Sequence, residues 1–221
     1  MYWSQVRILA GPPQFMENHL KRLSYFKEKG LINPKSILDI GSYKGHWTQM
    51  IKSLFPNSKF LMIEANHDLE NHLAKVGVPY KIALLGSEND KVVDYFKCKN
   101  FPHPTGNSIY LENTNYVFEP EKRKTITLDR LLNEKVQFDL IKMDVQGSEL
   151  DIIKGGKNII MKSSALILEM QISEYNKGAP MMNEIVAYLK KKNFILRELI
   201  DFLYKDGELI QVDGFFTKEK S

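Results

Sequence analysis

The sequence has 221 residues, of which 43% are hydrophobic, so it holds enough apolar material for one domain with a real core. It carries 31 lysines and arginines against 27 aspartates and glutamates, and opposite charges alternate along most of the chain. A nucleic-acid partner is therefore not expected, because such proteins cluster basic residues on one face. The single cysteine, Cys98, excludes an intrachain disulfide and favours a cytoplasmic location, and no apolar run reaches the ~18 residues of a membrane span.

Residues 1–15 show no apolar periodicity, and we expect them to form a disordered tail. The stretch VRILAGPP, Val6–Pro13, can be back-translated into the T-loop and CCA end of a bacterial tRNA gene. We therefore hypothesise that these residues result from a misassigned start and that translation begins at Met16. Residues 16–221 are expected to form one domain, which starts with an amphipathic helix that ends at Gly30.

Strand and helix patterns alternate after this helix. Residues 45–55 and 68–76 have apolar side chains at helical spacing and stop before Pro56 and at Gly77. Apolar runs of strand length surround them, at residues 35–40, 59–65 and 80–85. This order of elements predicts a parallel sheet with right-handed crossovers.

Residues 86–127 break the alternation, and we interpret them as an insertion packed over one end of the sheet. Residues 91–99 alternate as an edge strand does, 100–110 are rich in turn residues, and 123–128 look like another short strand. The alternation then resumes with strands at 138–145 and 165–170, helices at 149–161 and 181–192, and strands near 194–199 and 214–217. We predict a Rossmann-like α/β fold, in which a seven-stranded, mostly parallel sheet has helices on both faces.

The first predicted strand ends in LDIGSYKGHW, where Asp39, Gly41 and Gly45 form a D-x-G-x-x-x-G pattern. Ligands bind at the carboxyl ends of parallel strands, and glycines there let the backbone approach them closely. The loop is neither G-x-G-x-x-G nor a P-loop, so a phosphate-bearing cofactor is not indicated. Glu64 ends the second strand, where an acid can accept hydrogen bonds from ribose hydroxyls. This pair of acids suits S-adenosylmethionine, although Asp39 could instead cap a helix and Glu64 could be a surface acid.

The stretch FDLIKMDVQGSELDIIKGG, residues 138–156, places Lys142 inside a predicted buried strand. Lys142 and Asp144 share one face of that strand, and a buried lysine needs a partner, so we expect them to form an ion pair. In one reading Asp144 is a general base, Lys142 fixes its charge, and Glu149 joins them from the next helix. In the other, Asp144 and Glu169 hold a divalent metal. We slightly prefer the metal-free reading over the metal. In the structural alternative, Glu149 is a helix-start acid, Glu169 a solvated strand end and Lys142 a side chain whose stem is buried while its charge reaches solvent. This alternative carries as much weight as a functional role for Glu149, and less for Lys142 with Asp144.

Polar residues of the turn-rich insertion are candidates for substrate contacts, because loops over a pocket mouth often select the substrate. These candidates are His103, Asn107 and Ser108.

The blocks LDIGSYKGHWT, IEAN, IALL, TITLDRLL and residues 138–156 resemble successive blocks of the FkbM-type methyltransferases. These are class I, S-adenosylmethionine-dependent O-methyltransferases, and the resemblance covers residues 36–169. It implies that the cofactor is contacted by Asp39, Gly41, Ser42, Gly45, Glu64, Ala65, Ile82, Ala83 and Asp144. The chain departs from the family at Gln146, where glutamate is usual, at Asn66, where proline is frequent, and in the loop residues SYK.

The resemblance implies methylation of a hydroxyl, on a sugar of a polysaccharide, glycolipid or secondary metabolite. A small-molecule or glycan acceptor is thus the expected partner, while a homodimer or an association with glycosyltransferases stays open. The alternatives are an RNA or protein methyltransferase, or a binding module of the same fold without turnover. Base N-methylation is disfavoured because no N-P-P-Y or D-P-P-Y sequence follows the fourth strand, and an NAD-dependent oxidoreductase is disfavoured by the missing glycine fingerprint.

Overall fold

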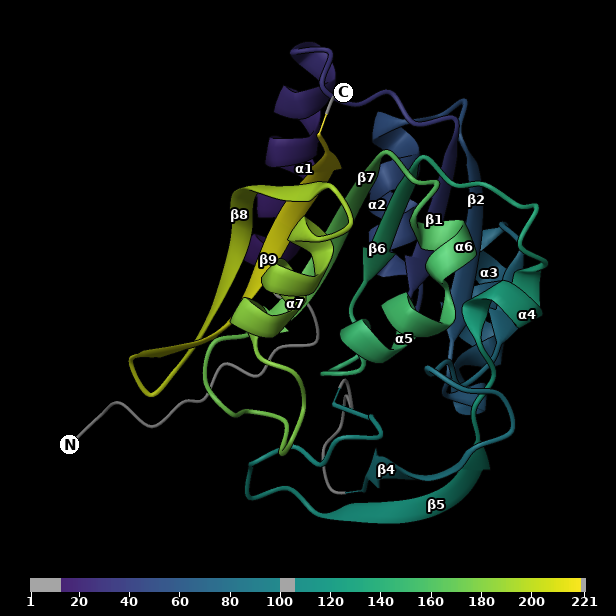
Figure 1. Ribbon diagram of the computed structural model, residues 1–221, viewed down its shortest axis with the longest axis vertical. Helices are drawn as coiled ribbons and strands as arrows, with labels where there is room; N and C mark the ends of the chain where they lie inside the picture. Colours follow the sequence, from purple (N-terminus) through teal and green to yellow (C-terminus); the bar gives the residue numbers. More distant parts are fainter. Residues whose placement is uncertain (1–12, 100–105, 220–221) are drawn as a thin grey trace.

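The computed structural model describes residues 13–99 and 106–219, and its centre is one seven-stranded sheet (Figure 1). The strand order is β3-β2-β1-β6-β7-β9-β8. These strands are β1 (Ser36–Ile40), β2 (Lys59–Glu64), β3 (Tyr80–Ile82), β6 (Leu140–Met143), β7 (Ala165–Gln171), β8 (Phe194–Lys205) and β9 (Glu208–Lys218). The first five in spatial order are parallel, and β9 is antiparallel to both of its neighbours. The predicted Rossmann-like fold is therefore confirmed.

Helices cover both faces of the sheet, as predicted. On one face lie α1 (Pro13–Glu28), α2 (His46–Leu54) and α3 (Glu70–Val76), which follows a 3-10 turn, η1 (His67–Leu69). On the other face lie α4 (Leu128–Leu132), α5 (Glu149–Gly155), α6 (Lys157–Ile160) and α7 (Met182–Lys190).

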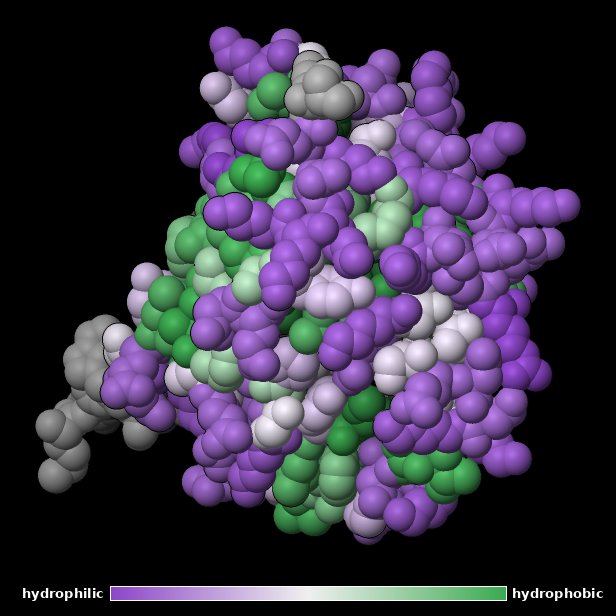
Figure 2. All heavy atoms as spheres, in the orientation of Figure 1, coloured by the Kyte–Doolittle hydropathy of each residue, from purple (hydrophilic) through white to green (hydrophobic). Residues whose placement is uncertain are grey.

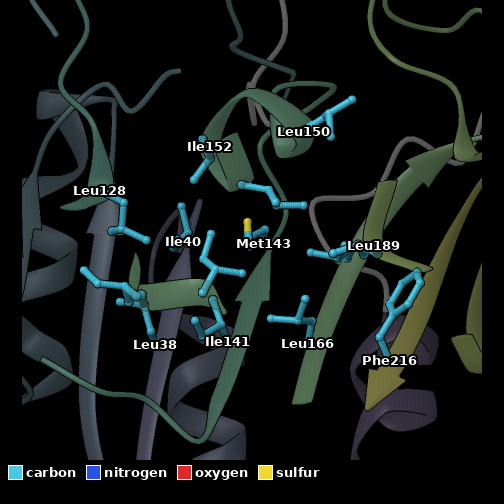
Figure 3. Close-up of a cluster of buried hydrophobic side chains, with 14 of the residues drawn as sticks. Leu38, Ile40, Leu128, Ile141, Met143, Leu150, Ile152, Leu166, Leu189 and Phe216 are labelled. Atoms are coloured by element: carbon cyan, nitrogen blue, oxygen red, sulfur yellow. The ribbon is translucent and has the colours of Figure 1, made fainter. Parts of the chain in front are cut away.

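The two hydrophobic cores follow from the alternation of side chains along the buried strands. Ile141 and Met143 of β6 point into the core beneath α4 to α7, together with Leu38 and Leu166 (Figure 3). Leu140, one position along β6, points into the other core beneath α1 and α2. Lys142 shares the face of Leu140, and this places its charge on the α2 side of the sheet.

Several predicted boundaries were wrong for local reasons. The helix expected at 149–161 is two helices, because Gly156 leaves the helical region with φ −113 and ψ 24. The strand expected at 123–128 ends at Lys124, and Thr127 instead caps α4 by accepting a hydrogen bond from the backbone N–H of Arg130. The last two strands are longer than predicted and form a hairpin. Its turn, Asp206–Gly207, has positive φ at both residues, as a tight hairpin turn requires.

The segment at 86–127 contains a separate antiparallel pair, β4 (Val92–Cys98) and β5 (Phe118–Lys124). Figure 1 shows this pair beyond the carboxyl ends of the central strands. Several hydrogen bonds fasten it there, among them two to carbonyl oxygens of the cavity loops. Ser108 Oγ donates to the carbonyl oxygen of Gln146 at 2.8 Å, and Arg123 Nη1 donates to that of Ala65 at 2.6 Å. The segment therefore covers the loops that follow β2 and β6.

The edge strand β8 carries exposed apolar and aromatic side chains at Phe202, Leu203 and Tyr204. Figure 2 shows a largely hydrophilic face on which apolar residues gather at the left, where β8 and β9 lie in Figure 1. Within residues 13–99 and 106–219, no helix has the length and hydropathy needed to cross a bilayer.

Candidate active site

A cavity opens at the carboxyl ends of β1, β2 and β6, beneath the β4–β5 segment. Among the predicted site residues, its lining includes Gly41, Ser42, Glu64, Ala65, Ala83, Asn107, Ser108, Lys142 and Asp144. Asp39, Gly45, Ile82, Glu149 and Glu169 are not part of the lining. His103 lies outside the described residues. The structure thus brings most of the predicted cofactor and catalytic residues to one place.

The two glycines after β1 are needed for packing of the chain against itself. Gly41 has φ +74, and a Cβ there would lie 1.8 Å from the carbonyl oxygen of Asp144. Gly45 has φ +78 and precedes α2, where a Cβ would lie 2.5 Å from the side chain of Val76. The first loop can therefore reach the ends of β6 and α3 only with glycine at both positions.

Glu64, at the end of β2, joins the loops that follow β1 and β2. Its Oε2 accepts a hydrogen bond from the backbone N–H of Tyr43 at 2.7 Å, and its Oε1 accepts one from Asn66 at 2.8 Å. Burial raises the pKa of Glu64 to about 7, against the effect of these backbone donors. Each carboxylate oxygen keeps a further lone pair, so this side chain can still accept hydrogen bonds from a ligand in the cavity.

Lys142 forms the predicted ion pair with Asp144, its Nζ lying 3.1 Å from Oδ2. It also lies 3.7 Å from Oδ1 of Asp39, a fully buried carboxylate whose Oδ2 accepts a hydrogen bond from Thr48. Burial alone would lower the pKa of Lys142, but Asp144 and Asp39 raise it above its usual value. Lys142 therefore stays charged, and Asp39 acts from behind the cavity wall as its second counter-ion.

Asp144 presents a partly exposed carboxylate to the cavity. Its side chain is 26% exposed, whereas that of Lys142 is 4% exposed. Its second oxygen, Oδ1, accepts a hydrogen bond from Gln146 Nε2 at 3.1 Å. Lys142 and Gln146 thus hold the carboxylate plane from two sides while lone pairs stay available.

Glu149 is not among the residues that line the cavity, and its catalytic role stays a prediction. It is buried, and its Oε1 accepts a hydrogen bond from the backbone N–H of Val145 at 3.0 Å. Burial raises its pKa to about 8. The side chain therefore closes the loop between β6 and α5.

Glu169 does approach Asp144, as predicted, but Gln146 lies between them. Nε2 of Gln146 is 2.6 Å from Glu169 Oε2, which also accepts a hydrogen bond from Gln211 at 3.1 Å. Burial and the nearby carboxylate of Asp144 raise the pKa of Glu169 well above its usual value. These hydrogen bonds give a role to Gln146, a position at which the sequence departs from the family pattern.

Asn107 and Ser108 line the cavity, but hydrogen bonds within the protein already engage their side chains. Asn107 Oδ1 accepts from the backbone N–H of Cys98 at 2.9 Å, and Ser108, 2% exposed, donates to the loop after β6. Both hold the β4–β5 segment in place, and their contact with substrate stays a prediction.

Sequence reasoning missed several lining residues, including Tyr43, His46, Trp47 and Tyr95. Tyr95 is buried beneath the guanidinium of Arg123, whose carbon lies 4.7 Å from the ring centroid. The period-two pattern of residues 91–99 marks Tyr95 as one of the side chains on a common face of β4. It does not show that this face turns toward the cavity.

A family model described as the methyltransferase FkbM domain matches residues 39–196. The chain belongs to the FkbM methyltransferase family. It is accordingly an S-adenosylmethionine-dependent methyltransferase, and the resemblance inferred from the sequence blocks is confirmed. A comparison with curated proteins gave no match.

Solved methyltransferases share the fold of this FkbM methyltransferase at low sequence identity. Magnesium protoporphyrin IX methyltransferase from Synechocystis PCC 6803, solved with bound SAM, is 7% identical with a TM-score of 0.56, covering 99% of this chain and 87% of that chain. Precorrin-6y C5,15-methyltransferase from Geobacter metallireducens GS-15 is 12% identical with a TM-score of 0.54, covering 99% and 94%. A plantazolicin methyltransferase in complex with SAH is 11% identical with a TM-score of 0.52, covering 93% and 85%.

The donor set of the cavity fits S-adenosylmethionine better than a phosphate-bearing cofactor. Glu64 offers carboxylate oxygens at the end of β2, and Ala83 and Leu84 supply apolar wall beyond it. Lys142 is the only lysine or arginine among the described lining residues, and it is already paired with carboxylates. A described lining with carboxylates and no unpaired lysine or arginine is suited to a ribose and a cationic sulfonium.

A second group of potential metal ligands, His19, Asp201 and Asp213, lies on α1, β8 and β9. Trp47 Nε1 can only donate, and it lies 3.1 Å from Nδ1 of His19. The imidazole proton is therefore on Nε2, which donates to Asp213 Oδ2 at 2.8 Å. A cation at Nε2 would have to displace this proton, so the hydrogen bonds of His19 disfavour its use as a metal ligand.

Proposed function

We propose that this FkbM methyltransferase methylates a hydroxyl group, with Asp144 as the general base. The observation that carries the proposal is the partly exposed Asp144 carboxylate on the cavity wall, held by Lys142 on one oxygen and by Gln146 on the other. An alcohol must lose its proton as its oxygen attacks, and a fixed carboxylate within reach of the hydroxyl can accept that proton.

The protein's own residues have separate tasks in this step. S-adenosylmethionine, when bound, supplies a methyl group on a cationic sulfur. Asp144 accepts the hydroxyl proton as the new oxygen–carbon bond forms and the carbon–sulfur bond breaks. Lys142 holds the Asp144 carboxylate in place through their ion pair, and Glu64 accepts hydrogen bonds from the ribose. The β4–β5 segment limits the access of water, because Tyr95 and Ser108 close the cavity from above.

The acceptor that we propose is a sugar of a polysaccharide, glycolipid or secondary metabolite. The support comes from the family resemblance alone, since the similar solved methyltransferases are named for substrates unrelated to one another. The described lining has no track of unpaired basic side chains that would favour an RNA acceptor.

Transfer of a radiolabelled methyl group to a panel of glycosides tests the function. We expect Asp144→Asn, which keeps the shape of the side chain, to lower the rate by about 100- to 10,000-fold. The affinity for S-adenosylhomocysteine should change by only a few-fold. Asp68→Asn, at an exposed acid on η1, is the matched control and should leave the rate unchanged. An Asp144→Asn variant with the wild-type rate would contradict the proposed base, and transfer to total RNA alone would contradict the sugar acceptor.

A further inference from the structure

Gln146 follows β6 in a backbone conformation that few residues with a side chain adopt. Its φ is +56, and that of Gly147 is +100. The carbonyl oxygen of Gln146 accepts the 2.8 Å hydrogen bond from Ser108, and a Cβ at Gly147 would lie 2.6 Å from the side chain of Ala179. The loop is thus fixed from both sides, and strain of this kind persists only where the surroundings enforce it.

The side chain of Gln146 lies between two carboxylates. Nε2 is 2.6 Å from Glu169 Oε2 and 3.1 Å from Asp144 Oδ1. A carboxamide nitrogen carries two hydrogens, so each carboxylate receives one of them. The two acids come from the ends of β6 and β7, which are adjacent parallel strands. Their closeness is therefore built into the sheet.

Two carboxylates that face each other need a positive group or a donor between them. A divalent cation, a shared proton or a neutral donor can fill this need. Here the carboxamide nitrogen lies at hydrogen-bond distance from both oxygens, so a cation bound by both acids would have to displace it. An ionised glutamate at this position could not donate in this way.

We propose that Gln146 is the positioning residue of the methyl-transfer site: its carboxamide takes the place of a divalent cation between Asp144 and Glu169, so that Asp144 can act without a metal. This inference rests on the proposed function, in which Asp144 is the general base. It also specifies the acceptor further. The acceptor hydroxyl is oriented by hydrogen bonds. The acceptor therefore does not need two neighbouring oxygens that could chelate a metal.

Calorimetric titration of Mn²⁺ into the full chain, with S-adenosylhomocysteine present, tests the proposal. Wild type should show no saturable Mn²⁺ binding. Gln146→Glu places a third carboxylate where the donor was and should bind Mn²⁺ saturably, at least about tenfold more tightly than any residual binding by wild type. The double variant Gln146→Glu/Glu169→Gln should show no saturable Mn²⁺ binding. Retained binding of S-adenosylhomocysteine shows that each variant is folded.

Gln211→Glu is the matched control, because Gln211 also donates to Glu169 Oε2 but makes no such contact with Asp144. We expect Gln211→Glu to bind Mn²⁺ no better than wild type. If it bound Mn²⁺ as tightly as Gln146→Glu, the specific role assigned to Gln146 would be contradicted. Saturable Mn²⁺ binding by wild type that Glu169→Gln removes would overturn the proposal without any variant at position 146. A folded Gln146→Glu variant that binds Mn²⁺ no better than wild type would also overturn the proposal. Failure of wild type to bind S-adenosylhomocysteine would instead count against the proposed function, so the two failures are distinguishable.

Discussion

Replacing Lys142 with methionine should destabilise the fold strongly, because its ammonium group is the shared counter-ion of two carboxylates. Nζ lies 3.1 Å from Asp144 and 3.7 Å from Asp39, and Asp39 has no solvent exposure. Removing one partner of a buried ion pair costs about 3–5 kcal/mol, since the other charge stays buried without compensation. In a chain of this length that loss corresponds to a fall of roughly 6–20 °C in Tm.

Equilibrium denaturation in urea measures this loss, and a double-mutant cycle assigns it to the pair. Asp39→Asn removes the stranded charge, so Lys142→Met should cost about 2 kcal/mol less in the Asp39→Asn background than in wild type. Lys177→Met, at an exposed lysine, should stay within about 0.5 kcal/mol of wild type. A Lys142→Met variant within about 1 kcal/mol of wild type, or strictly additive effects in the cycle, would refute the reasoning.

Three further predictions concern the cavity and its loops. The pKa of Glu149 is raised to about 8, so its contribution to stability is fully present below pH 4.5 and is lost as the pH rises through 8. The free energy of unfolding of wild type, measured in urea, should therefore fall between pH 5 and 8. In Glu149→Gln this fall should be smaller, by at most about 5 kcal/mol. Gly41→Ala should lose about 2–4 kcal/mol of stability and weaken S-adenosylhomocysteine binding at least about tenfold, whereas Gly30→Ala, which has similar φ but open space, should show only the ~1 kcal/mol of backbone strain. Glu64→Gln should weaken S-adenosylhomocysteine binding by about 10- to 100-fold in calorimetry, and Glu70→Gln, at an exposed acid, should not.

The sequence predicted those parts of the site that depend on strand periodicity. Because alternate residues of a strand share a face, the spacing of Lys142 and Asp144 was enough to predict their ion pair. The positions of Gly41 and Glu64 at the ends of successive parallel strands likewise predicted that they line one cavity.

The periodicity of the sequence did not predict the roles of residues that depend on loop conformation. Glu149 accepts a hydrogen bond from a backbone N–H four residues earlier, and Gln146, whose φ is positive, reaches Glu169. Neither feature leaves a periodic trace in the sequence. The β-branched run before α4 was mistaken for a strand, since strand propensity outweighed the capping signal of Thr127.

The central claim is that the cavity at the ends of β1, β2 and β6 binds the S-adenosyl cofactor. Calorimetric titration of S-adenosylhomocysteine into the full chain tests it most directly, with NAD⁺ as the comparison ligand. We predict saturable binding of one S-adenosylhomocysteine per chain, weakened by Glu64→Gln, and no binding of NAD⁺. Absence of S-adenosylhomocysteine binding to the folded wild-type protein, or binding that Glu64→Gln leaves unchanged, would contradict the account.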